Sequence, residues 1–380
     1  MVRTNTVVTL FTVVVLLAAA SAFEARAEQV RSESLPGLEP LPGMGGGLPG
    51  MDEPAAESGV VNTTVDTRTP AARGPRVDSS LLIDTARAGD RIVAVGERGI
   101  VLLSDDQGKT WRQANVPVRT LLTAVDFADD QLGWAVGHDA VVLNTTDGGE
   151  NWVVQHYAPE LDAPMLDVVA LDARNVLASA ALGMVFRTED GGDSWTDTQL
   201  NMTLGDFLGM PESFDDFSPH WFAVDRAGDG SLYLAGERGV IAHSDDGGRN
   251  WQQISSPYNG SLFGVGFLSD GGVIVYGMRG NAFASSDGGV HWRKLETGTD
   301  RSLNADVTLA NGSLLLSGMA GTMLWSGDSG ATFIPIEQPN RADVLAALPL
   351  VAAGGDGREL LLLTSRGKRM GRILDPIDAD

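Results

Sequence analysis

One octet, repeated six times, constrains the fold of this chain more than any other feature. Its form is [Ser/Thr]-x-Asp-x-Gly-x-x-aromatic, and the copies occupy residues 104–111, 145–152, 188–195, 244–251, 285–292 and 326–333. The steps between the closing aromatic residues are 41, 43, 56, 41 and 41 residues. A period in the forties indicates one supersecondary unit that is copied around an axis or along a solenoid.

A second signature precedes the octet at constant distance. The turns Gly-Glu-Arg-Gly (96–99 and 236–239), Gly-Met-Arg-Gly (277–280) and Gly-Met-Ala-Gly (318–321) each begin ten residues before the aspartate of an octet, and 137–140 and 180–183 are weaker forms. Within one copy, residues 123–127, 133–136, 140–145 and 151–155 are short β-branched or aromatic runs bounded by turn residues, which is typical of strands. Four antiparallel strands per repeat predict one blade of a β-propeller.

The octet is expected to form the turn between the third and fourth strands of a blade. Its aspartate can accept backbone N–H groups of the turn, its fifth-position glycine allows a conformation that a Cβ would obstruct, and its tryptophan can bury an apolar face. This is the Asp-box, or bacterial neuraminidase repeat. Metal or sugar binding by the aspartates is the alternative, but Asp and Gly at these positions favour turn chemistry.

We predict an all-β fold, a seven-bladed β-propeller with Asp-box repeats. Residues 344–351, 359–364 and 368–374 read as three strands of a last blade that has no octet. The segment Val60 to Val65 is apolar and β-branched enough to supply its fourth strand, which would close the ring and remove a free sheet edge. Six blades is the alternative if the tail packs outside the ring.

The first 27 residues resemble a secretory signal peptide. Arg3 precedes an uncharged stretch, and Ala25-Arg26-Ala27 fits a cleavage site; an uncleaved anchor is the alternative, although the apolar core is short for a membrane span. We therefore expect a signal peptide (1–27), a disordered Pro/Gly-rich tether (28–77) with the closing strand near 60–65, and a propeller (78–380), located in the periplasm or, in a phototroph, the thylakoid lumen.

Composition excludes several classes of function. The formal net charge of −23 opposes binding of nucleic acid and of anionic headgroups. The five histidines have no metal-ligand spacing, so we expect no metal and no cofactor. The chain has no cysteine, which a large propeller core tolerates in an oxidising compartment.

The arginines of the second signature are the first candidate site. Arg98, Arg238, Arg279 and Arg366 occupy equivalent turns in blades one, four, five and seven. Since consecutive turns of a blade alternate between faces, they should form a partial ring on the face opposite the Asp-boxes. Clustered guanidinium groups bind carboxylates and phosphates through forked hydrogen bonds. The alternative is that an arginine merely suits a tight turn or pairs with the adjacent Glu97 or Glu237.

The second candidate is an insertion on the same face. The 56-residue step carries extra residues between blades three and four, and Phe207, Leu208 and Met210 make them apolar. Such a loop can offer a binding patch, or it can fold back over the propeller.

An enzyme is not expected, and no residue is assigned a catalytic role. A sialidase needs an arginine triad, a tyrosine nucleophile with an acidic partner and usually an Arg-Ile-Pro segment, and no Arg-Ile-Pro is present. The Asp-box endoglucanases use a cleft between two propellers, whereas this chain has the repeats of one. A sialidase-like glycoside hydrolase or a glycan-binding propeller stays the alternative function, because fold alone does not decide chemistry.

The signal peptide, the Gly-x-x-Gly turns ten residues ahead of each box and the last blade without a box together resemble the photosystem II stability/assembly factor family over roughly Val77 to Leu374. The resemblance implies a non-catalytic, monomeric propeller that acts as a scaffold or chaperone for a membrane protein complex, with the four arginines as the surface that binds the partner and no small-molecule substrate. Cyanobacterial members are commonly lipoproteins, which this chain without cysteine cannot be. The partner would be photosystem II-like in a phototroph and an envelope transporter in a heterotroph.

Overall fold

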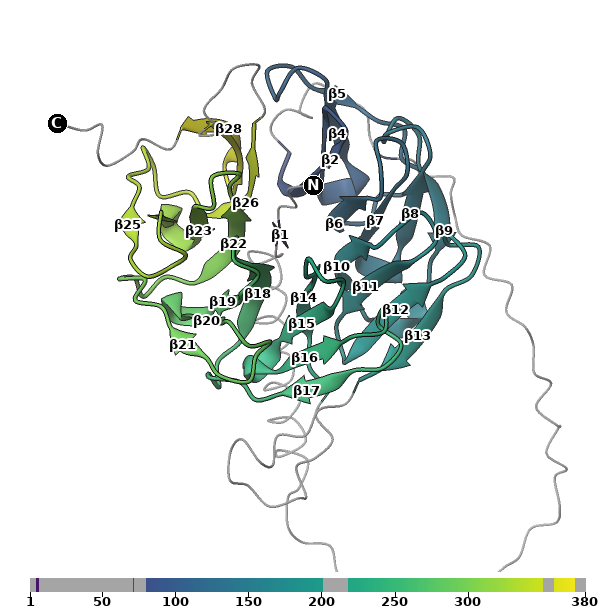
Figure 1. The fold of residues 1–380 in the computed structure, drawn as a ribbon. Coiled ribbons are helices and arrows are strands. Elements are labelled where there is room, and N and C mark those ends of the chain that lie inside the picture. Colours follow the sequence, from purple (N-terminus) through teal and green to yellow (C-terminus); the bar gives the residue numbers. More distant parts are fainter. Residues whose placement is uncertain (1–4, 7–70, 72–79, 201–217, 351–358, 373–380) are drawn as a thin grey trace, which may run out of the picture. The chain divides into compact units, whose positions relative to one another are not determined.

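The computed structural model describes residues 5–6, 71, 80–200, 218–350 and 359–372, all of them in one compact unit. Their strands form seven antiparallel sheets arranged as the blades of a propeller (Figure 1). The first strand of each blade contacts the first strands of its neighbours, and β26 of the last blade contacts β2 of the first, which closes the ring. The predicted seven-bladed, all-β propeller is confirmed, and the six-bladed alternative is wrong.

The first four blades follow the chain without exchange of strands. Blade 1 contains β2 (Leu82–Ala88), β3 (Arg91–Gly96), β4 (Val101–Ser104) and β5 (Arg112–Gln113). Blade 2 contains β6 (Leu122–Phe127), β7 (Gly133–Gly137), β8 (Val142–Thr145) and β9 (Val153–His156). Blade 3 contains β10 (Met165–Ala170), β11 (Val176–Ala180), β12 (Met184–Thr188) and β13 (Thr196–Gln199). Blade 4 contains β14 (Trp221–Arg226), β15 (Leu232–Gly236), β16 (Ile241–Ser244) and β17 (Gln252–Ile254).

The last three blades complete the ring. Blade 5 contains β18 (Leu262–Phe267), β19 (Val273–Gly277), β20 (Ala282–Ser285) and β21 (Arg293–Lys294). Blade 6 contains β22 (Leu303–Thr308), β23 (Leu314–Gly318), β24 (Met323–Ser326) and β25 (Ile334–Pro335), and the pair β1 (Asn5–Thr6) adds to the free edge of β22. Blade 7 contains β26 (Val344–Pro349), β27 (Glu359–Thr364) and β28 (Gly367–Arg372). The segment 60–65, predicted as its fourth strand, lies outside the described residues and stays a prediction.

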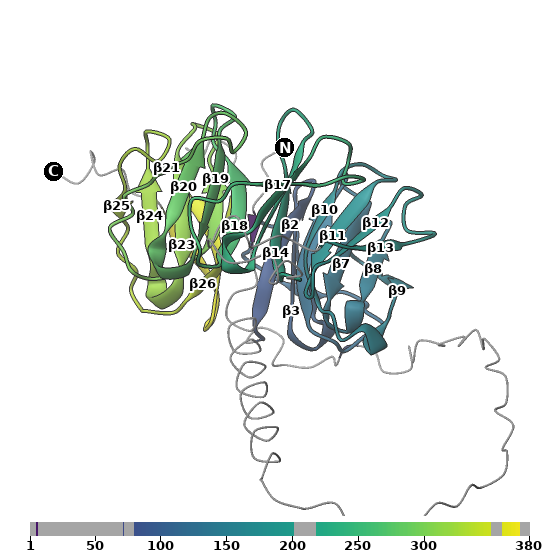
Figure 2. The ribbon, with the colours of Figure 1, turned by 90° about the horizontal axis from the view of Figure 1, so that it is seen from below.

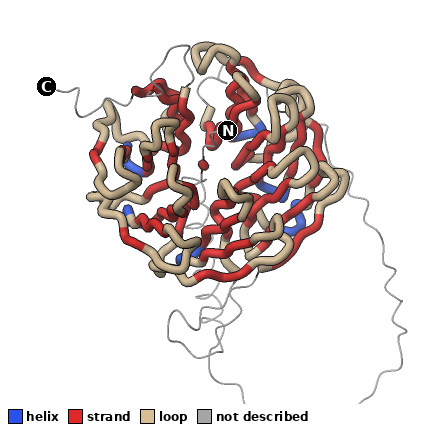
Figure 3. Tube along the Cα trace, viewed as in Figure 1, coloured by secondary structure: helices blue, strands red, loops and turns tan. Residues whose placement is uncertain are grey.

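Short 3-10 turns join the second and third strands of five blades (Figure 3). They are η2 (Glu97–Gly99), η3 (His138–Ala140), η6 (Glu237–Gly239), η7 (Met278–Gly280) and η8 (Met319–Gly321), and η4 (Pro159–Leu161) lies in the connection to blade 3. The octets join the third and fourth strands. Because these two turns stand at opposite ends of the third strand, they lie on opposite faces of the propeller. Figure 2 shows the propeller from the side.

Apolar side chains of adjacent blades form the core. The second strands are almost entirely buried, and the outermost strands are largely exposed, as in β13. Buried or half-buried carboxylates add links between blades, because an aspartate on one first strand accepts the backbone N–H of the next first strand. These bonds are Asp84 to Val125 (2.8 Å), Asp126 to Ala170 (2.8 Å) and Asp167 to Val224 (3.0 Å).

The Asp-box is a self-satisfied turn, as its sequence predicts. In blade 2 the Thr145 hydroxyl donates to Asp147 Oδ1 (2.8 Å) and accepts the Gly149 N–H (3.0 Å). The Asn151 N–H donates to the same carboxylate (3.0 Å), and Gly149 has a φ of 89°, which favours glycine. Since hydrogen bonds within the turn occupy the aspartate, the box stabilises the turn of its own blade.

No described helix is long and apolar enough to cross a membrane. Apart from Asn5 and Thr6, the predicted signal peptide lies outside the described residues.

Candidate functional site

The arginine-turn face is the face that carries the turns between second and third strands, including Arg98, Arg238, Arg279 and Arg366. Three of these arginines sit in the left-handed region, with φ of 57° at Arg98, 54° at Arg238 and 57° at Arg279. The next residue is a glycine at a close approach, since a Cβ on Gly239 would lie 1.8 Å from the Tyr258 carbonyl oxygen. The glycine is therefore required by the fold.

The arginine itself is not required by this backbone. Asp139, Leu182 and Ala320 have φ of 60°, 58° and 55° at the equivalent positions of blades 2, 3 and 6. The left-handed conformation costs a side-chain-bearing residue about 1–2 kcal/mol, and Asn or Asp tolerates it best. The interpretation that arginine merely suits the turn is therefore not supported by the geometry.

The adjacent glutamates face the backbone. Glu97 Oε1 accepts the Leu81 N–H at 3.1 Å, and Glu237 Oε2 lies 3.0 Å from His220 Nδ1. Burial raises the pKa of Glu237, but the hydrogen bonds and charge of His220, together with the charge of Arg238, outweigh burial, and the pKa is lowered overall. These glutamates tie the turn to the first strand of their own blade, and in blade 4 the charge of Arg238 also acts on the neighbouring Glu237.

All four arginine side chains are exposed. Blades 4 and 5 are neighbours, as are blades 7 and 1, so Arg238 and Arg279 occupy adjacent blades and so do Arg366 and Arg98. The backbone N–H groups of Arg238 and Arg279 each donate to a serine hydroxyl of the following blade at 3.4 Å. The acceptors are Ser261 and Ser302. The predicted partial ring thus consists of two pairs on one face.

Arg366 differs from the other three in its turn. Thr364 pairs with Gly367, so Ser365 and Arg366 form a two-residue hairpin in place of a 3-10 turn. The Thr364 hydroxyl donates to the Gly367 carbonyl at 2.6 Å and accepts the Arg366 N–H at 3.2 Å. Thr at the position of the usual first glycine explains the difference, since its hydroxyl closes the turn.

Further arginines of this face were missed in the sequence. Arg119, Arg301 and Arg341 are exposed and lie in connections between the outer strand of one blade and the first strand of the next. A Cβ on Gly99 would lie 3.3 Å from the Arg119 Cα, and one on Gly321 equally close to the Arg341 Cα, so both border the turns. In the sequence these arginines could have been found because each lies two or three residues before the first strand of a blade.

The insertion leaves from the same face. Gly183, in the equivalent turn of blade 3, donates its N–H to Pro219 (2.6 Å) and accepts the Leu200 N–H (2.7 Å), so both stems of residues 201–217 meet there. The Glu237 N–H donates to His220 at 2.9 Å, which places the second stem beside the turn of Arg238. Phe207, Leu208 and Met210 lie outside the described residues, so the structure does not place them near the arginines.

Groups that could serve other chemistries are separated or buried. The described residues contain no group of three or more His, Asp or Glu that could hold a metal ion. The structure does pair a tyrosine with a carboxylate, Tyr276 with Asp306 at 2.8 Å, which sequence reasoning had not singled out. Tyr276 is fully buried, and burial raises its pKa well above the usual value. A substrate has no access to this pair, which is therefore structural.

The family model for the photosynthesis system II assembly factor YCF48 matches residues 104–212. The chain is 29% identical over 105 residues to the photosystem II assembly lipoprotein Ycf48 of Synechococcus sp. strain CC9902, covering 27% of this chain and 31% of the relative. It is 24% identical over 175 residues to the chloroplastic stability/assembly factor HCF136 of Arabidopsis thaliana, covering 42% of each. The chain thus spans less than half the length of these curated relatives. They are named as assembly factors, not as enzymes.

Solved structures share the fold over more of the chain. A YCF48 bound to a D1 peptide superposes with a TM-score of 0.63 at 19% identity, covering 78% of this chain and 95% of that one. YCF48 from Cyanidioschyzon merolae gives 0.62 at 18% identity, covering 80% and 97%. A virginiamycin B lyase gives 0.62 at 11% identity, so this fold also carries enzymes. The chain is thus similar over part of its length to photosystem II assembly factors, and it shares the propeller fold of the solved YCF48 structures.

Proposed function

We propose that the protein is a non-catalytic scaffold or chaperone, exported to the periplasm or the thylakoid lumen, that assists assembly of a membrane protein complex. One observation carries the proposal. Arg98, Arg238 and Arg279 occupy a backbone conformation that Asp, Leu and Ala adopt at the equivalent positions of other blades, and all four arginine side chains are exposed in a chain of net charge −23. Recurrent exposed guanidinium groups against an acidic background favour an acidic partner.

The partner segment that fits is an extended acidic stretch or a chain terminus of a membrane protein. Arg238 and Arg279 would bind its carboxylates, and Phe207, Leu208 and Met210 of the insertion would bury against its apolar side chains. A solved relative is described as bound to a D1 peptide, which supports a peptide ligand for this kind of propeller. In a phototroph the complex would be photosystem II-like, and in a heterotroph an envelope transporter.

The proposal is tested by measuring how well a variant with reversed charges on the arginine-turn face captures the membrane partner. A desolvated guanidinium–carboxylate contact contributes on the order of 1.5–3 kcal/mol. The double variant Arg238→Glu, Arg279→Glu should therefore bind at least tenfold more weakly in a titration against solubilised membranes with quantification of the captured complex.

The matched control reverses two charges on the opposite face. Lys109 and Arg174 are exposed on the Asp-box side, and changing both to Glu alters net charge by the same amount. That variant should retain affinity. Equal loss in both variants would show a general charge effect, and full capture by the Arg238/Arg279 variant would remove the arginine-turn face from the function.

A further inference from the structure

The clefts between neighbouring blades on the Asp-box face are not equivalent. Between blades 1 and 2, Arg112 contacts Glu150 and lies 3.2 Å from Asp105. Arg91 joins the same two carboxylates, at 2.6 Å from Asp105 and 3.1 Å from Glu150. Hydrogen bonding to Glu150 raises the pKa of Arg112, and hydrogen bonding to Arg91 lowers that of Asp105. In this cleft a four-membered ion network pairs both arginines with carboxylates, beside a cavity of about 500 Å³ that Arg91, Asp105 and Glu150 line.

Strand register identifies the same positions between blades 5 and 6. Ile92 pairs with Ser104 and Leu103 with Arg112, as Val273 pairs with Ser285 and Ala284 with Arg293. The octets supply the remaining equivalences, so Gly272, Ser286, Arg293 and Ala331 stand for Arg91, Asp105, Arg112 and Glu150 respectively. One arginine is kept, while both of its carboxylate partners and the second arginine are replaced by small residues.

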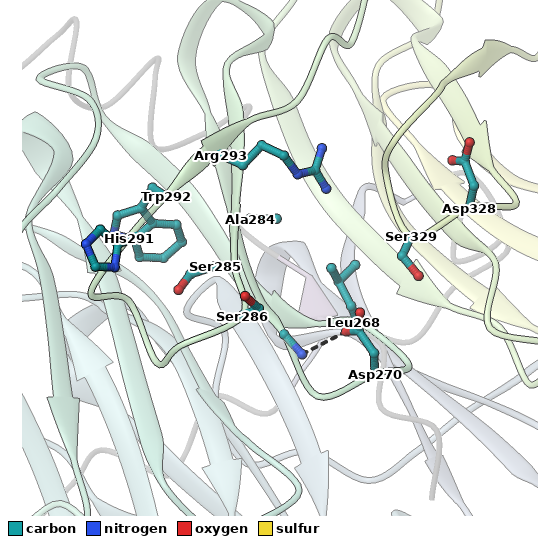
Figure 4. A pocket seen from close by; sticks show the side chains of 11 residues that line it. Leu268, Asp270, Ala284, Ser285, Ser286, His291, Trp292, Arg293, Asp328 and Ser329 are labelled. Atoms are coloured by element: carbon teal, nitrogen blue, oxygen red, sulfur yellow. Dashed lines mark hydrogen bonds between the residues drawn. The ribbon is translucent and has the colours of Figure 1, made fainter.

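The replacements leave an arginine beside a cavity. Arg293 donates to the Gly330 carbonyl at a long 3.5 Å, and no described carboxylate lies within ion-pairing distance of it. The cavity measures about 350 Å³. Trp292 and His291 lie on one side of it and Asp328 and Ser329 on the other, with Asp270 near Leu268 below (Figure 4).

The box tryptophan at this cleft differs from those of blades 1, 2 and 4. Trp111, Trp152 and Trp251 donate their indole N–H to the glycine carbonyl of their own box, at 2.9, 2.9 and 3.1 Å. Trp292 donates instead to Ser255 of the preceding blade at 3.0 Å. Its ring is half-buried and lines the cavity, so an aromatic surface and a guanidinium group border the same space.

We infer that the cleft between blades 5 and 6 binds a compact organic carboxylate, and that the ligand is an acidic sugar of the hexuronate class. Its carboxylate would pair with Arg293, in the role that Glu150 has for Arg112. A planar guanidinium group binds a carboxylate through two parallel hydrogen bonds.

The other residues that line the cavity favour a ligand with a sugar ring. Asp270 and Asp328 oppose a bare anion. Asp270 can also accept a hydrogen bond from a sugar hydroxyl, and its Oδ1 is fixed by the Gly272 N–H at 2.9 Å, whereas Asp328 is bound within its own box turn. Ser286 and Ser329 add hydroxyls, and Trp292 offers an apolar surface to the ring. A binding site of this kind differs from the sequence expectation that the chain binds no small molecule.

The experiment compares three probes by calorimetric or NMR titration of the full chain. Glucuronate should bind, whereas glucose, which has the ring without the carboxylate, and glutarate, which has carboxylates without the ring, should each bind at least tenfold more weakly. Arg293→Met should abolish glucuronate binding.

The decisive variant rebuilds the arginine–carboxylate pair of the cleft between blades 1 and 2. Ala331→Glu places a carboxylate where Glu150 stands, so it should pair with Arg293 and exclude glucuronate at least tenfold, while Ala331→Gln, of the same size, should exclude it far less. Thermal melting checks that the variants fold. Binding of glucose or glutarate equal to that of glucuronate, no binding of any probe at millimolar concentration, or glucuronate binding indifferent to Ala331→Glu and Arg293→Met would overturn the inference.

Discussion

The two faces of the propeller use their polar side chains in different ways. On the Asp-box face, aspartates are held by their own turns, and arginines such as Arg91 and Arg112 are held by carboxylates of neighbouring boxes. On the arginine-turn face the glutamates hold the backbone, and the arginines extend outward. Polar groups bonded within the fold contribute to stability, and exposed charged groups are accessible to a partner. Repetition alone therefore does not separate structure from function, because both signatures recur.

The largest effect should come from a box tryptophan. Trp152 is 4% exposed, packs edge-on against Phe127 at 6.2 Å and closes its turn through Gly149. Trp152→Ala should lower the free energy of unfolding by about 3–5 kcal/mol in urea denaturation, because it leaves a cavity between blades. Trp292→Ala should cost less, since that ring is half-buried and does not close its own turn. Equal losses would contradict the distinction drawn between these two boxes.

Folding stability should decrease at acidic pH because the aspartates of the Asp-box face become protonated. Hydrogen bonds within the turns lower the pKa of Asp106, Asp246, Asp287 and Asp328 from 3.8 to about 2. A folded-state pKa below the unfolded value means that the stabilisation is present above the unfolded pKa and is lost as pH falls through the folded pKa. Stability should thus decline as pH falls from roughly 4 to 2, measured as the urea midpoint. Replacing Asp106 and Asp246 by Asn should flatten this limb, and an unchanged slope would count against the boxes as its source.

The sequence predicts local features of this fold well. The spacing of boxes and turns places the strands of blade 2 within two residues of their observed bounds, since each turn is built from residues a few positions apart. It does not predict links between blades, such as Asp84 to Val125, because these join residues a whole repeat apart. For the same reason the sequence does not reveal that Arg293 lacks the carboxylate partners of Arg112, which appears only when the registers of two blades are compared.

The sequence predicts which face of the propeller carries the candidate site, but it does not predict which of the four arginines lie in neighbouring blades. Equivalent positions in blades must share a face, so the four arginines are placed correctly. Their grouping into two pairs depends on which blades carry them and on the ring being closed by β26 and β2. The hairpin at Arg366 was not foreseen, because it follows from the single hydroxyl of Thr364.

The smallest effect on stability is expected where the effect on function is proposed to be largest. Arg238→Ala and Arg279→Ala together should change the free energy of unfolding by less than about 0.5 kcal/mol, since substitutions at exposed turn positions without buried contacts usually stay within that range. Ala320 occupies the equivalent position in blade 6 at a φ of 55°, so alanine is already compatible with this turn. The measurement is the urea midpoint of the double variant beside its partner capture. A loss of stability comparable to that of Trp152→Ala would mean that these arginines hold the fold, and the contrast between the two faces would then fail.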